Sequence, residues 1–218
     1  MGSVKLVAMT KPMIEGVETP EQFIAYCARV SNPSNQLNNE TAEKLLTYCV
    51  KNKHWSIFET VNIVLEIQTT RDIARQILRH RSFSFQEFSQ RYAEVTDSMF
   101  EQREARLQDT KNRQNSIENE DGHLDIEFRL AQHKVTELAK SAYKWAIENG
   151  IAKEVARSVL PEGLTMSRMY MSGSLRSWIH YCELRMANGT QKEHRLIAEQ
   201  CWNVIVEQFP SLKTVLEQ

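Results

Sequence analysis

The strongest constraint on the fold is a strand pattern that leads directly into a helix pattern. From position 61 to 68, apolar and polar side chains alternate with a period of two, which is typical of a half-buried strand. The apolar members of this pattern are Val61, Ile63, Leu65 and Ile67. Apolar residues then recur at helical spacing, at Ile73, Ala74, Ile77 and Leu78. The sequence therefore predicts a strand that is followed directly by a helix.

Positive charge is concentrated in the stretch from Thr70 to Tyr92, which contains that helix. The basic residues of this stretch are Arg71, Arg75, Arg79, His80, Arg81 and Arg91. The whole chain is almost neutral, with 27 Lys and Arg, 28 Asp and Glu and a net charge of −1. A local basic cluster in such a chain favours a small anionic ligand, because a polyanion such as DNA would call for a broad basic face.

The order of side chains within this stretch suggests a binding site. Helical spacing predicts one stripe of arginines, formed by Arg71, Arg75 and Arg79. It also predicts a group of converging donors, formed by Gln76, Arg79 and His80. A simpler interpretation is that the basic triplet at 79–81 ends a helix, where cations stabilise the dipole by about 0.3–1 kcal/mol. The segment 82–91 favours a functional role, because it alternates small polar and aromatic residues before ending in Ser, Gln and Arg.

A motif in this stretch resembles that of a known family. Arg79-His80-Arg81 is followed, after seven residues, by Ser89, with Glu87 and Arg91 beside it. This arrangement resembles the signature of the flavin-dependent thymidylate synthases, and its spacing matches without a gap. The resemblance extends over residues 4–209, apart from the polar segment 97–125. It implies reductive methylation of dUMP to dTMP, with methylenetetrahydrofolate as carbon donor and with FAD, reduced by NADPH, as hydride carrier.

The resemblance also implies partners and an assembly. Members of the family are homotetramers whose flavin sites lie between subunits, so a homotetramer with interface sites is expected here. The expected small-molecule ligands are dUMP, the folate and NADPH, and neither a nucleic acid nor a membrane is expected as a partner. The expected chemistry uses no cysteine nucleophile, because no thiol has a base or helix N-terminus that would make it acidic. Reduced core thiols are expected at Cys27, Cys49, Cys182 and Cys201.

Several classes of site lack their motifs in this sequence. The six histidines show no metal-binding spacing, so no metal site is expected. Neither GxGxxG nor a P-loop is present, so a nucleotide cofactor would be held by side chains and helix ends. No apolar run approaches the ~20 residues of a membrane span. The N-terminus lacks the layout of a signal peptide, so a cytoplasmic protein is expected.

The expected fold class is α+β, a helix-rich single domain over residues 1–218 around a modest, mainly antiparallel sheet. A chain of this length can bury roughly 70% of its unfolded surface in one domain. Strands are predicted at 4–9, 61–68 and 164–172. Further helices are predicted from 20 (with Thr19 as N-cap), at 40–52, at 154–160 and at 175–187. The polar, variable segment 97–125 is interpreted as a solvated helix with a mobile loop.

Two predicted helices carry specific expectations about burial. A long helix from Ile126 to Asn149 is predicted to face inward with Leu130, Val135, Leu138, Ala142 and Trp145. The helix at 175–187 is predicted to bury Leu175, Trp178, Cys182 and Met186. A capping box at 190–193 is predicted to open the last long helix.

The resemblance assigns roles to segments outside the basic stretch. His54, Ser56 and Glu59 match a His-x-Ser/Thr-x-x-Glu segment that lies against the flavin. The alternative for this segment is a loop with a local hydrogen bond between Ser56 and Glu59. Arg176 and His180 lie on a helix that runs along the flavin in the family, although a surface pair is the alternative. His180 stands where many members have Asn, and Gly189 stands where many have His.

Arginines and one serine carry the expected nucleotide chemistry. Arg157 matches a family arginine that reaches the nucleotide, whereas a solvated or snorkelling side chain is the alternative. Arg185 is expected near the uracil ring, where it cannot accept a proton but can stabilise negative charge by roughly 3–4 kcal/mol. Ser89 is a candidate nucleophile by residue type. No base is spaced to activate it, so a phosphate- or nucleotide-binding role is preferred.

The complete set of expected site residues follows from these matches. The expected cofactor-binding residues are His54, Ser56, Glu59, Arg79, His80, Arg81, Ser82, Glu87, Ser174, Arg176, His180 and Gln191. The expected substrate-binding residues are Gln76, Arg79, Glu87, Phe88, Ser89, Gln90, Arg91, Arg157 and Arg185. The candidate catalytic residues are Arg185 and Ser89. Glu193, in a matched Gln-x-Glu, is expected to cap a helix.

Two other functions are compatible with parts of the sequence. In a non-catalytic nucleotide- or RNA-binding module, the arginines would meet phosphate and Phe83, Phe85 and Phe88 would stack on bases. The balanced net charge argues against this alternative. A phosphoryl-transfer enzyme is disfavoured because the chain lacks a P-loop and a carboxylate cluster for Mg²⁺.

Overall fold

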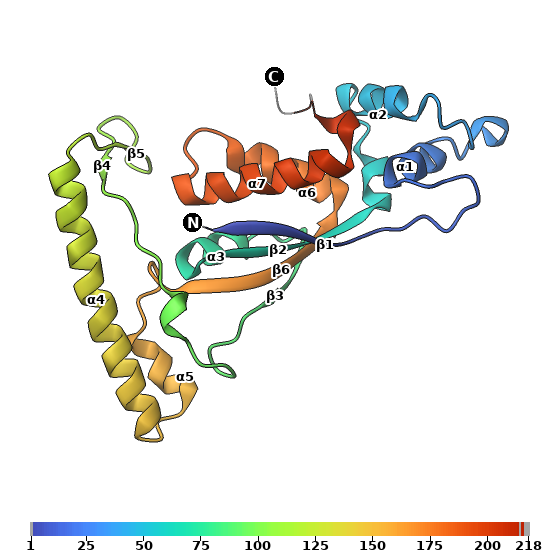
Figure 1. Cartoon of the computed structure of the whole chain (residues 1–218). Helices are drawn as coiled ribbons and strands as arrows, with labels where there is room; N and C mark the ends of the chain where they lie inside the picture. Colours follow the sequence, from blue (N-terminus) through green and yellow to red (C-terminus); the bar gives the residue numbers. More distant parts are fainter. Residues whose placement is uncertain (1, 214, 216–218) are drawn as a thin grey trace.

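A small antiparallel sheet connects the two ends of the molecule (Figure 1). The computed structural model describes residues 2–213 and 215, so Met1, Thr214 and residues 216–218 of the expected domain lie outside the described residues. The sheet has the strand order β1-β2-β6-β3, and each neighbouring pair is antiparallel. Its strands are β1 (Ser3–Met9), β2 (Asn62–Thr70), β6 (Met166–Ser174) and β3 (Ser84–Glu87). The expected α+β class with an antiparallel sheet is confirmed.

One face of the sheet forms the core of the molecule. Ile63, Leu65 and Ile67 of β2 are at most 1% exposed, while Asn62 and Gln68 on the same strand are exposed, which confirms the period-two pattern. Helices α6 (Leu175–Met186) and α7 (Lys192–Gln208) cover this apolar face (Figure 1). At one end pack α1 (Pro20–Ala28) and α2 (Ala42–Lys51), joined by η1 (Pro33–Asn35). Thr19 is the N-cap of α1, as predicted, and it forms a capping box with Gln22.

The strand-to-helix junction forms as predicted, but the basic stretch then changes direction. β2 continues directly into α3 (Arg71–Ile77), so the helix ends before Arg79. The predicted stripe of three arginines is therefore wrong: Arg71 is only 7% exposed, and Arg75 pairs with Glu162 at 3.0 Å. Residues 84–87 form strand β3, which the sequence did not predict. Its alternating polar and aromatic residues fit an edge strand paired with β6.

The polar segment 97–125 is not a solvated helix. It contains η3 (Asp97–Met99) and a hairpin of β4 (Arg106–Gln108) and β5 (Ser116–Glu118). The long helix α4 (Gly122–Glu148) begins after the hairpin, with Asp121 as its N-cap. The prediction failed because the charged side chains of this segment pair with residues elsewhere in the chain, as the network below shows.

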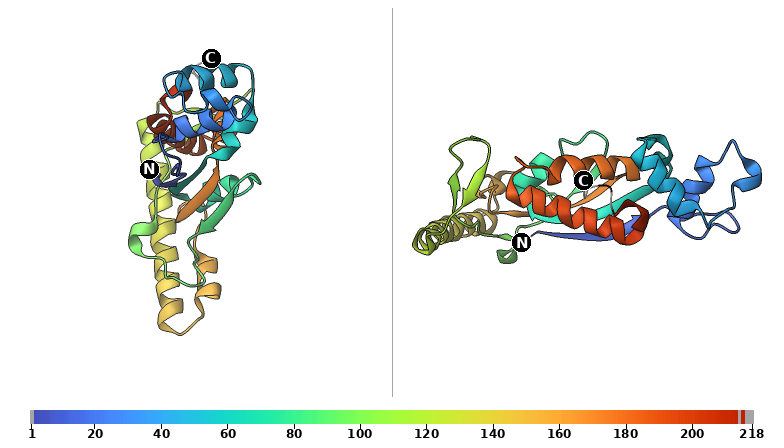
Figure 2. Two further views of the ribbon diagram at one scale, coloured as in Figure 1. Left: turned by 90° about the vertical axis from the view of Figure 1, so that its right-hand side faces the viewer. Right: turned by 90° about the horizontal axis from the view of Figure 1, so that it is seen from above.

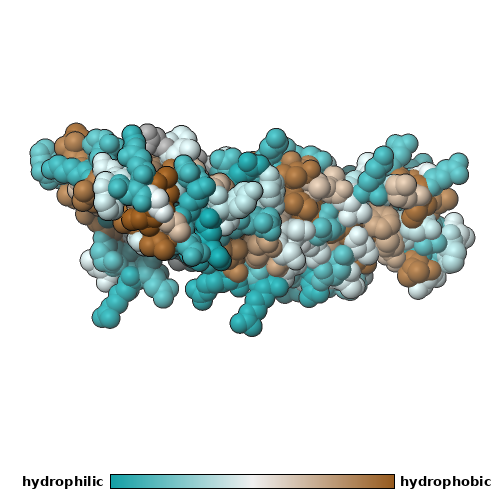
Figure 3. Space-filling view, turned by 90° about the horizontal axis from the view of Figure 1, so that it is seen from below, coloured by the Kyte–Doolittle hydropathy of each residue, from teal (hydrophilic) through white to brown (hydrophobic). Residues whose placement is uncertain are grey.

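The predicted inward face of α4 is also wrong. Leu130, Val135, Leu138 and Trp145 are 51–73% exposed, and Ala142 is half-buried. The buried positions of the helix are instead Gln132, Thr136, Ala139, Tyr143 and Ala146. The reason is that α4 stands apart from the sheet (Figures 1 and 2) and packs with a small second cluster around Val95, Ala156 and Leu160. Apolar patches are visible at the α4 end of the molecule in Figure 3.

The remaining elements follow the expected order. The predicted helix at 154–160 is α5 (Lys153–Ala156) continued by η4 (Arg157–Val159), and the segment after His54 is η2 (Trp55–Thr60). The last element of the described residues is η5 (Pro210–Leu212). All four cysteines are free, and three of them are buried. Among the described residues, no helix is long and apolar enough to cross a membrane, and no cluster of His, Cys, Asp or Glu could hold a metal ion.

Candidate active site

Helix α6 connects two groups of predicted site residues. The helix begins directly after β6, where the Ser174 hydroxyl accepts a hydrogen bond from the Ser177 amide at 3.2 Å. Near this end, Arg176 donates to Glu59 Oε1 at 2.9 Å. Near the other end, Arg185 Nε donates to His80 Nε2 at 2.8 Å. With a rise of 1.5 Å per residue, the two arginine positions are about 13 Å apart along the helix. The sequence did not determine how these two groups are placed.

His80 holds Arg185 in one orientation. Because Nε2 of His80 accepts this hydrogen bond, His80 is neutral and carries its proton on Nδ1. Burial and the positive charges of Arg185 and Arg79 lower the pKa of His80 to about 4, so the neutral state is stable at neutral pH. The terminal nitrogens of Arg185 form no hydrogen bond with any described residue. The guanidinium group is thus fixed at Nε, and its other donors are available to a ligand.

Neither of the two simple side-chain pairs that were considered as alternatives, Ser56 with Glu59 and Arg176 with His180, forms near the start of α6. Glu59 binds Arg176 rather than Ser56, and His180 lies 3.6 Å from Glu183 rather than pairing with Arg176. The His180 ring packs edge-on against Trp55, with ring centroids 5.1 Å apart. His54, Ser56, Arg79, Arg81 and Ser82 are all exposed. Part of the set of residues expected to contact the flavin is therefore accessible, near the two ends of α6.

A second group of predicted residues lies near α5. Arg91 Nε is 3.3 Å from a carboxylate oxygen of Glu154, and Arg157 Nε donates to the backbone oxygen of Glu154 at 3.4 Å. Ser89 is exposed, whereas Gln90 is only 4% exposed and its side-chain nitrogen has no partner among the described residues. In Figure 1, α5 and α6 lie on opposite sides of the sheet. The structure thus brings Arg91 and Arg157 together but separates them from Arg185.

Glu87 and Phe88 are bound to residues of β6 and α3. Glu87 Oε1 accepts a hydrogen bond from Ser167 at 2.6 Å and lies 3.5 Å from Arg71. The Phe88 amide donates to the backbone oxygen of Arg168 at 2.8 Å. These contacts hold the backbone of the predicted signature against β6.

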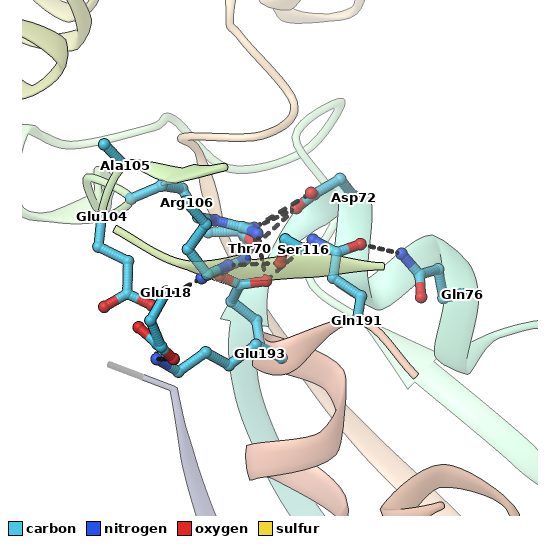
Figure 4. A network of polar contacts seen from close by, with 12 residues as sticks. Thr70, Asp72, Gln76, Glu104, Ala105, Arg106, Ser116, Glu118, Gln191 and Glu193 are labelled. Carbon is cyan, nitrogen blue, oxygen red and sulfur yellow. Dashed lines mark hydrogen bonds and ion pairs between the residues drawn. The ribbon is translucent and has the colours of Figure 1, made fainter. Parts of the chain in front are cut away.

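Glu193 does not cap α7, contrary to the prediction. Gln191 is the N-cap and makes no side-chain capping bond. The Glu193 carboxylate lies instead 2.9 Å from Arg103 and 2.7 Å from Arg106 (Figure 4). Burial raises the pKa of Glu193, but the charge of Arg103 and the hydrogen bonds from Arg106 and Gln191 lower it below its usual range. Both arginines were missed because they belong to the segment that was interpreted as solvated.

Two buried residues beneath His80 were also missed. Tyr181 and His194 are 1% and 0% exposed, and the Tyr181 hydroxyl lies 3.1 Å from His194 Nε2. The Tyr181 ring packs edge-on against His80, with centroids 4.9 Å apart. The available signal was the position of His194 on the apolar face of α7, three and four residues before Ile197 and Ala198.

Two hollows in the described surface lie away from the predicted site. One is lined by residues of β2, the segment 101–104 and α7, and the other by residues 94–100 and α4. None of the expected cofactor- or substrate-binding residues lines either hollow.

Comparisons with known proteins agree with the resemblance found in the sequence. A model of the family described as "Thymidylate synthase complementing protein" matches residues 12–211. A relative described as a probable flavin-dependent thymidylate synthase, from Paramecium bursaria Chlorella virus 1, is 51% identical over 215 residues, 99% of each chain. The flavin-dependent thymidylate synthase of Synechocystis sp. is 51% identical over 98% of this chain and 99% of its own.

A solved structure with a similar fold supports the architecture. The UMP/dUMP methylase PolB from Streptomyces cacaoi, bound with 5-Br dUMP, superposes with a TM-score of 0.80. It covers 100% of this chain and 95% of its own, at 23% identity, so this likeness concerns the fold alone. The family match and the two relatives at 51% identity carry the assignment. The chain is a member of the flavin-dependent thymidylate synthase family, and it is an enzyme of that family.

Proposed function

We propose that this chain methylates dUMP to dTMP, using methylenetetrahydrofolate as carbon donor and FAD, reduced by NADPH, as hydride carrier. The observation that supports this most directly is the Arg185–His80 pair: one arginine, oriented by a neutral histidine, with free terminal donors beside the exposed Arg79. A pyrimidine ring offers carbonyl and N3 acceptors that match such donors. Negative charge that develops on this ring would be stabilised by roughly 3–4 kcal/mol per aimed donor.

Positive and polar side chains near the two ends of α6 would suit a flavin cofactor. At one end His54 is exposed and Arg176 is half-buried, and near the other end Arg79 and Arg81 are exposed. Arginine recognises phosphate through paired donors, so these ends could hold an extended dinucleotide. Bound FAD would supply the hydride for the reaction. Glu59 would keep Arg176 in place through their 2.9 Å contact.

The thiols of the chain do not suit nucleophilic attack. Burial raises the pKa of Cys182 and Cys201 well above the usual thiol range. Burial also raises the pKa of Cys49, and it raises that of Cys27 despite a hydrogen bond with Thr60. A raised pKa leaves little reactive thiolate at neutral pH. We therefore propose a route without a cysteine adduct, in which Arg185 activates the bound pyrimidine electrostatically.

The nucleotide phosphate would be held by the group near α5. Arg91 and Arg157 converge on Glu154, and the unpartnered amide nitrogen of Gln90 is buried nearby in sequence. Both arginines can give paired hydrogen bonds to a phosphate. Ser89 would add a hydroxyl donor, which agrees with its preferred binding role.

Because α5 and α6 lie on opposite sides of the sheet, we propose that each site combines residues from more than one subunit. The exposed apolar side chains of α4 support this assembly, since a helix with such a face is normally covered. A homotetramer with sites at subunit interfaces is the form expected for the family. A cytoplasmic location stays a prediction.

The non-catalytic RNA-binding alternative receives less support from the geometry. Phe83 is only 9% exposed and packs against Trp178 with ring centroids 4.8 Å apart, so it offers no free face to a base. Phe85 and Phe88 are half-buried.

The absorbance spectrum of the purified protein tests the proposed function. We expect a bound-flavin spectrum that changes when dUMP is added, and formation of dTMP when methylenetetrahydrofolate and NADPH are also present. A colourless protein that does not bind added FAD, with or without dUMP, would contradict the proposal. Salt-sensitive binding of single-stranded RNA by such a colourless protein would favour the alternative.

A further inference from the structure

A chain of hydrogen bonds runs from the surface of the molecule to the residues beneath Arg185. Gln191 Nε2 donates to Glu193 Oε2 at 2.9 Å, and Gln76 Nε2 donates to Gln191 Oε1 at 2.8 Å (Figure 4). Gln76 Oε1 lies 3.2 Å from His194 Nδ1, and His194 Nε2 lies 3.1 Å from the Tyr181 hydroxyl. Each contact joins a different pair of residues, so five side chains form one continuous path.

The direction of this path is set at Glu193. An ionised carboxylate only accepts hydrogen bonds, so Gln191 must turn its NH₂ group toward Glu193 and its oxygen toward Gln76. Gln76 must then turn its own oxygen toward His194. His194 Nδ1 therefore carries the proton that bonds to this oxygen, and Nε2 accepts from the Tyr181 hydroxyl. In every hydrogen bond of the path, the donor therefore lies on the Tyr181 side and the acceptor lies on the Glu193 side.

Arg103 and Arg106 keep Glu193 ionised and in place. Arg103 Nη1 and Arg106 Nη2 lie 2.9 and 2.7 Å from different oxygens of the Glu193 carboxylate. Arg103 is itself bound to Asp72 at 2.8 Å, and Arg106 donates from Nε to Ser116 at 2.9 Å. The polar segment that carries the hairpin is thereby attached to the outer end of the path.

The inner end of the path contacts the pair that orients Arg185. His194 is fully buried, its ring centroid is 6.4 Å from that of His80, and the Tyr181 ring packs on His80 at 4.9 Å. His80 accepts the hydrogen bond from Arg185 Nε. A positive charge on His194 would repel Arg185, and burial with the charge of Arg185 lowers the pKa of His194 to about 3. The inner end of the path therefore contains a neutral histidine, His194, that lies behind a second neutral histidine, His80.

We propose that Glu193, Gln191, Gln76, His194 and Tyr181 form a positioning relay that fixes His194 as its neutral Nδ1–H tautomer and thereby holds His80 and Arg185 for the reaction. Arg103 and Arg106 set the direction of the relay. His194 and Tyr181 are positioning residues because they reach the substrate only through His80 and Arg185. This inference rests on the proposed role of Arg185, and it gives the polar segment 97–125 a function in orienting that residue.

The tautomer of His194 can be measured without any activity assay. In holoenzyme labelled with ¹⁵N-histidine, the imidazole nitrogen shifts at pH 7 report which ring nitrogen carries the proton, and the spectrum of a His194→Asn variant identifies the signals. We expect a neutral ring protonated at Nδ1. In Glu193→Gln, an amide can present either atom to Gln191, so a population of the Nε2–H tautomer is expected. A wild-type His194 that is protonated at Nε2 would overturn the proposal.

Kinetics of matched tyrosine variants test the positioning role. Tyr181→Phe removes only the hydroxyl that donates to His194. Tyr143→Phe is the control, because Tyr143 is also buried and accepts one hydrogen bond from the Val95 amide at 3.2 Å. We expect Tyr181→Phe to lower kcat about 3- to 10-fold, as for loss of one neutral hydrogen bond, with little change in KM for dUMP or in the flavin spectrum. Tyr143→Phe should leave kcat unchanged.

Rescue separates positioning from general damage to the fold. Asn places an amide nitrogen near the position of Nδ1, so His194→Asn should keep the bond to Gln76 and retain more activity than His194→Leu at equal stability. Equal kcat in Tyr181→Phe and Tyr143→Phe, together with equal activity of the two His194 variants, would refute the relay. Wild-type protein that lacks flavin binding and turnover would refute the proposed function instead, and the tautomer measurement would still decide the relay.

Discussion

Arg185 combines a fixed anchor with free donors. Its Nε is bound to His80 at 2.8 Å, while its terminal nitrogens have no partner among the described residues. A guanidinium keeps its charge at every pH at which the protein is folded, so its contribution depends on orientation rather than on protonation. The orienting group, His80, is in contrast a titratable side chain.

Replacing Arg185 tests whether its donors, oriented by His80, contribute to the reaction. We expect Arg185→Ala to lower kcat for dTMP formation by about 100- to 1,000-fold, because an aimed donor to the developing charge is lost. The flavin spectrum should be retained. Activity is measured in a dTMP assay, with Arg113→Ala as control, since Arg113 is exposed on the hairpin loop. Near-normal turnover of Arg185→Ala would remove this residue from the mechanism.

The buried His194 and the half-buried His80 predict how the free energy of unfolding depends on pH. The pKa of His194 is about 3 in the folded protein, against about 6.5 for an ordinary histidine, so between these values the unfolded state binds the extra proton. Lowering the pH through this window therefore favours unfolding, by up to about 1.4 kcal/mol per pH unit for one group. His80, with a folded pKa of about 4, acts in the same direction.

Urea unfolding at pH 7 and pH 5 measures this dependence. We expect the wild-type free energy of unfolding to fall between these values, and His194→Asn to show a smaller fall because one titrating group is absent. His133→Asn, which changes an exposed histidine on α4, should retain the wild-type slope. An unchanged slope in His194→Asn would mean that His194 is not held neutral.

Among the elements, those with strong local signals were predictable and those built by long-range contacts were not. The strand β2 and the start of α1 follow from a period-two pattern and a capping box, which act within a few residues. The hairpin of β4 and β5 was missed because its stability comes from ion pairs to α7, as in Lys192 with Glu104 and Glu118, both at 2.7 Å. Charge composition alone does not reveal which partners a charged segment meets.

The cap of α1 gives a prediction at this scale. Thr19 Oγ1 accepts from the Gln22 amide at 3.2 Å, and the Gln22 side chain accepts from the Thr19 amide at 3.0 Å. Thr19→Ala should lower the free energy of unfolding by about 1 kcal/mol, measured in urea, because the capping acceptor is lost. Thr19→Ser keeps that oxygen and should be near wild type. Equal losses in both variants would show that the cap is not the cause.

Sequence motifs indicate candidate site residues, but they do not indicate how these residues are arranged. The signature at 79–91 and the arginines of α6 were identified from sequence motifs. Their division into a group beside α6 and a group near α5 depends on the order β2-β6-β3 of the strands in the sheet, which no short motif encodes. Tyr181 and His194 were missed because a buried polar pair on apolar helix faces has the sequence pattern of ordinary core residues.

At the scale of the whole molecule, α4 presents several exposed apolar side chains. Its exposed residues include Leu138 at 73% and Trp145 at 61%, on a helix that stands away from the sheet (Figure 2). Exposed apolar side chains that form a contiguous patch are typical of an interaction site. Assembly of copies of this chain through α4 would cover it and would bring residues near α5 toward another subunit.

A single added charge on α4 tests this assembly. Leu138→Glu should lower the molar mass measured by light scattering after size-exclusion chromatography, because a buried carboxylate without a partner opposes association. His133→Glu adds the same charge at an exposed polar position of the same helix and should leave the mass unchanged. If Leu138→Glu assembles as the wild type does, α4 is not part of the interface.

The placement of Arg176 and Arg185 on one continuous helix also has a practical consequence for inhibitor design. Nine residues at 3.6 residues per turn make two and a half turns, so the two side chains leave opposite sides of the helix, at positions about 13 Å apart along its axis. A short rigid compound that contacts one of these arginines therefore lies on the far side of α6 from the other. Inhibitors aimed at the Arg176 end and at the Arg185 end would thus be separate series of compounds.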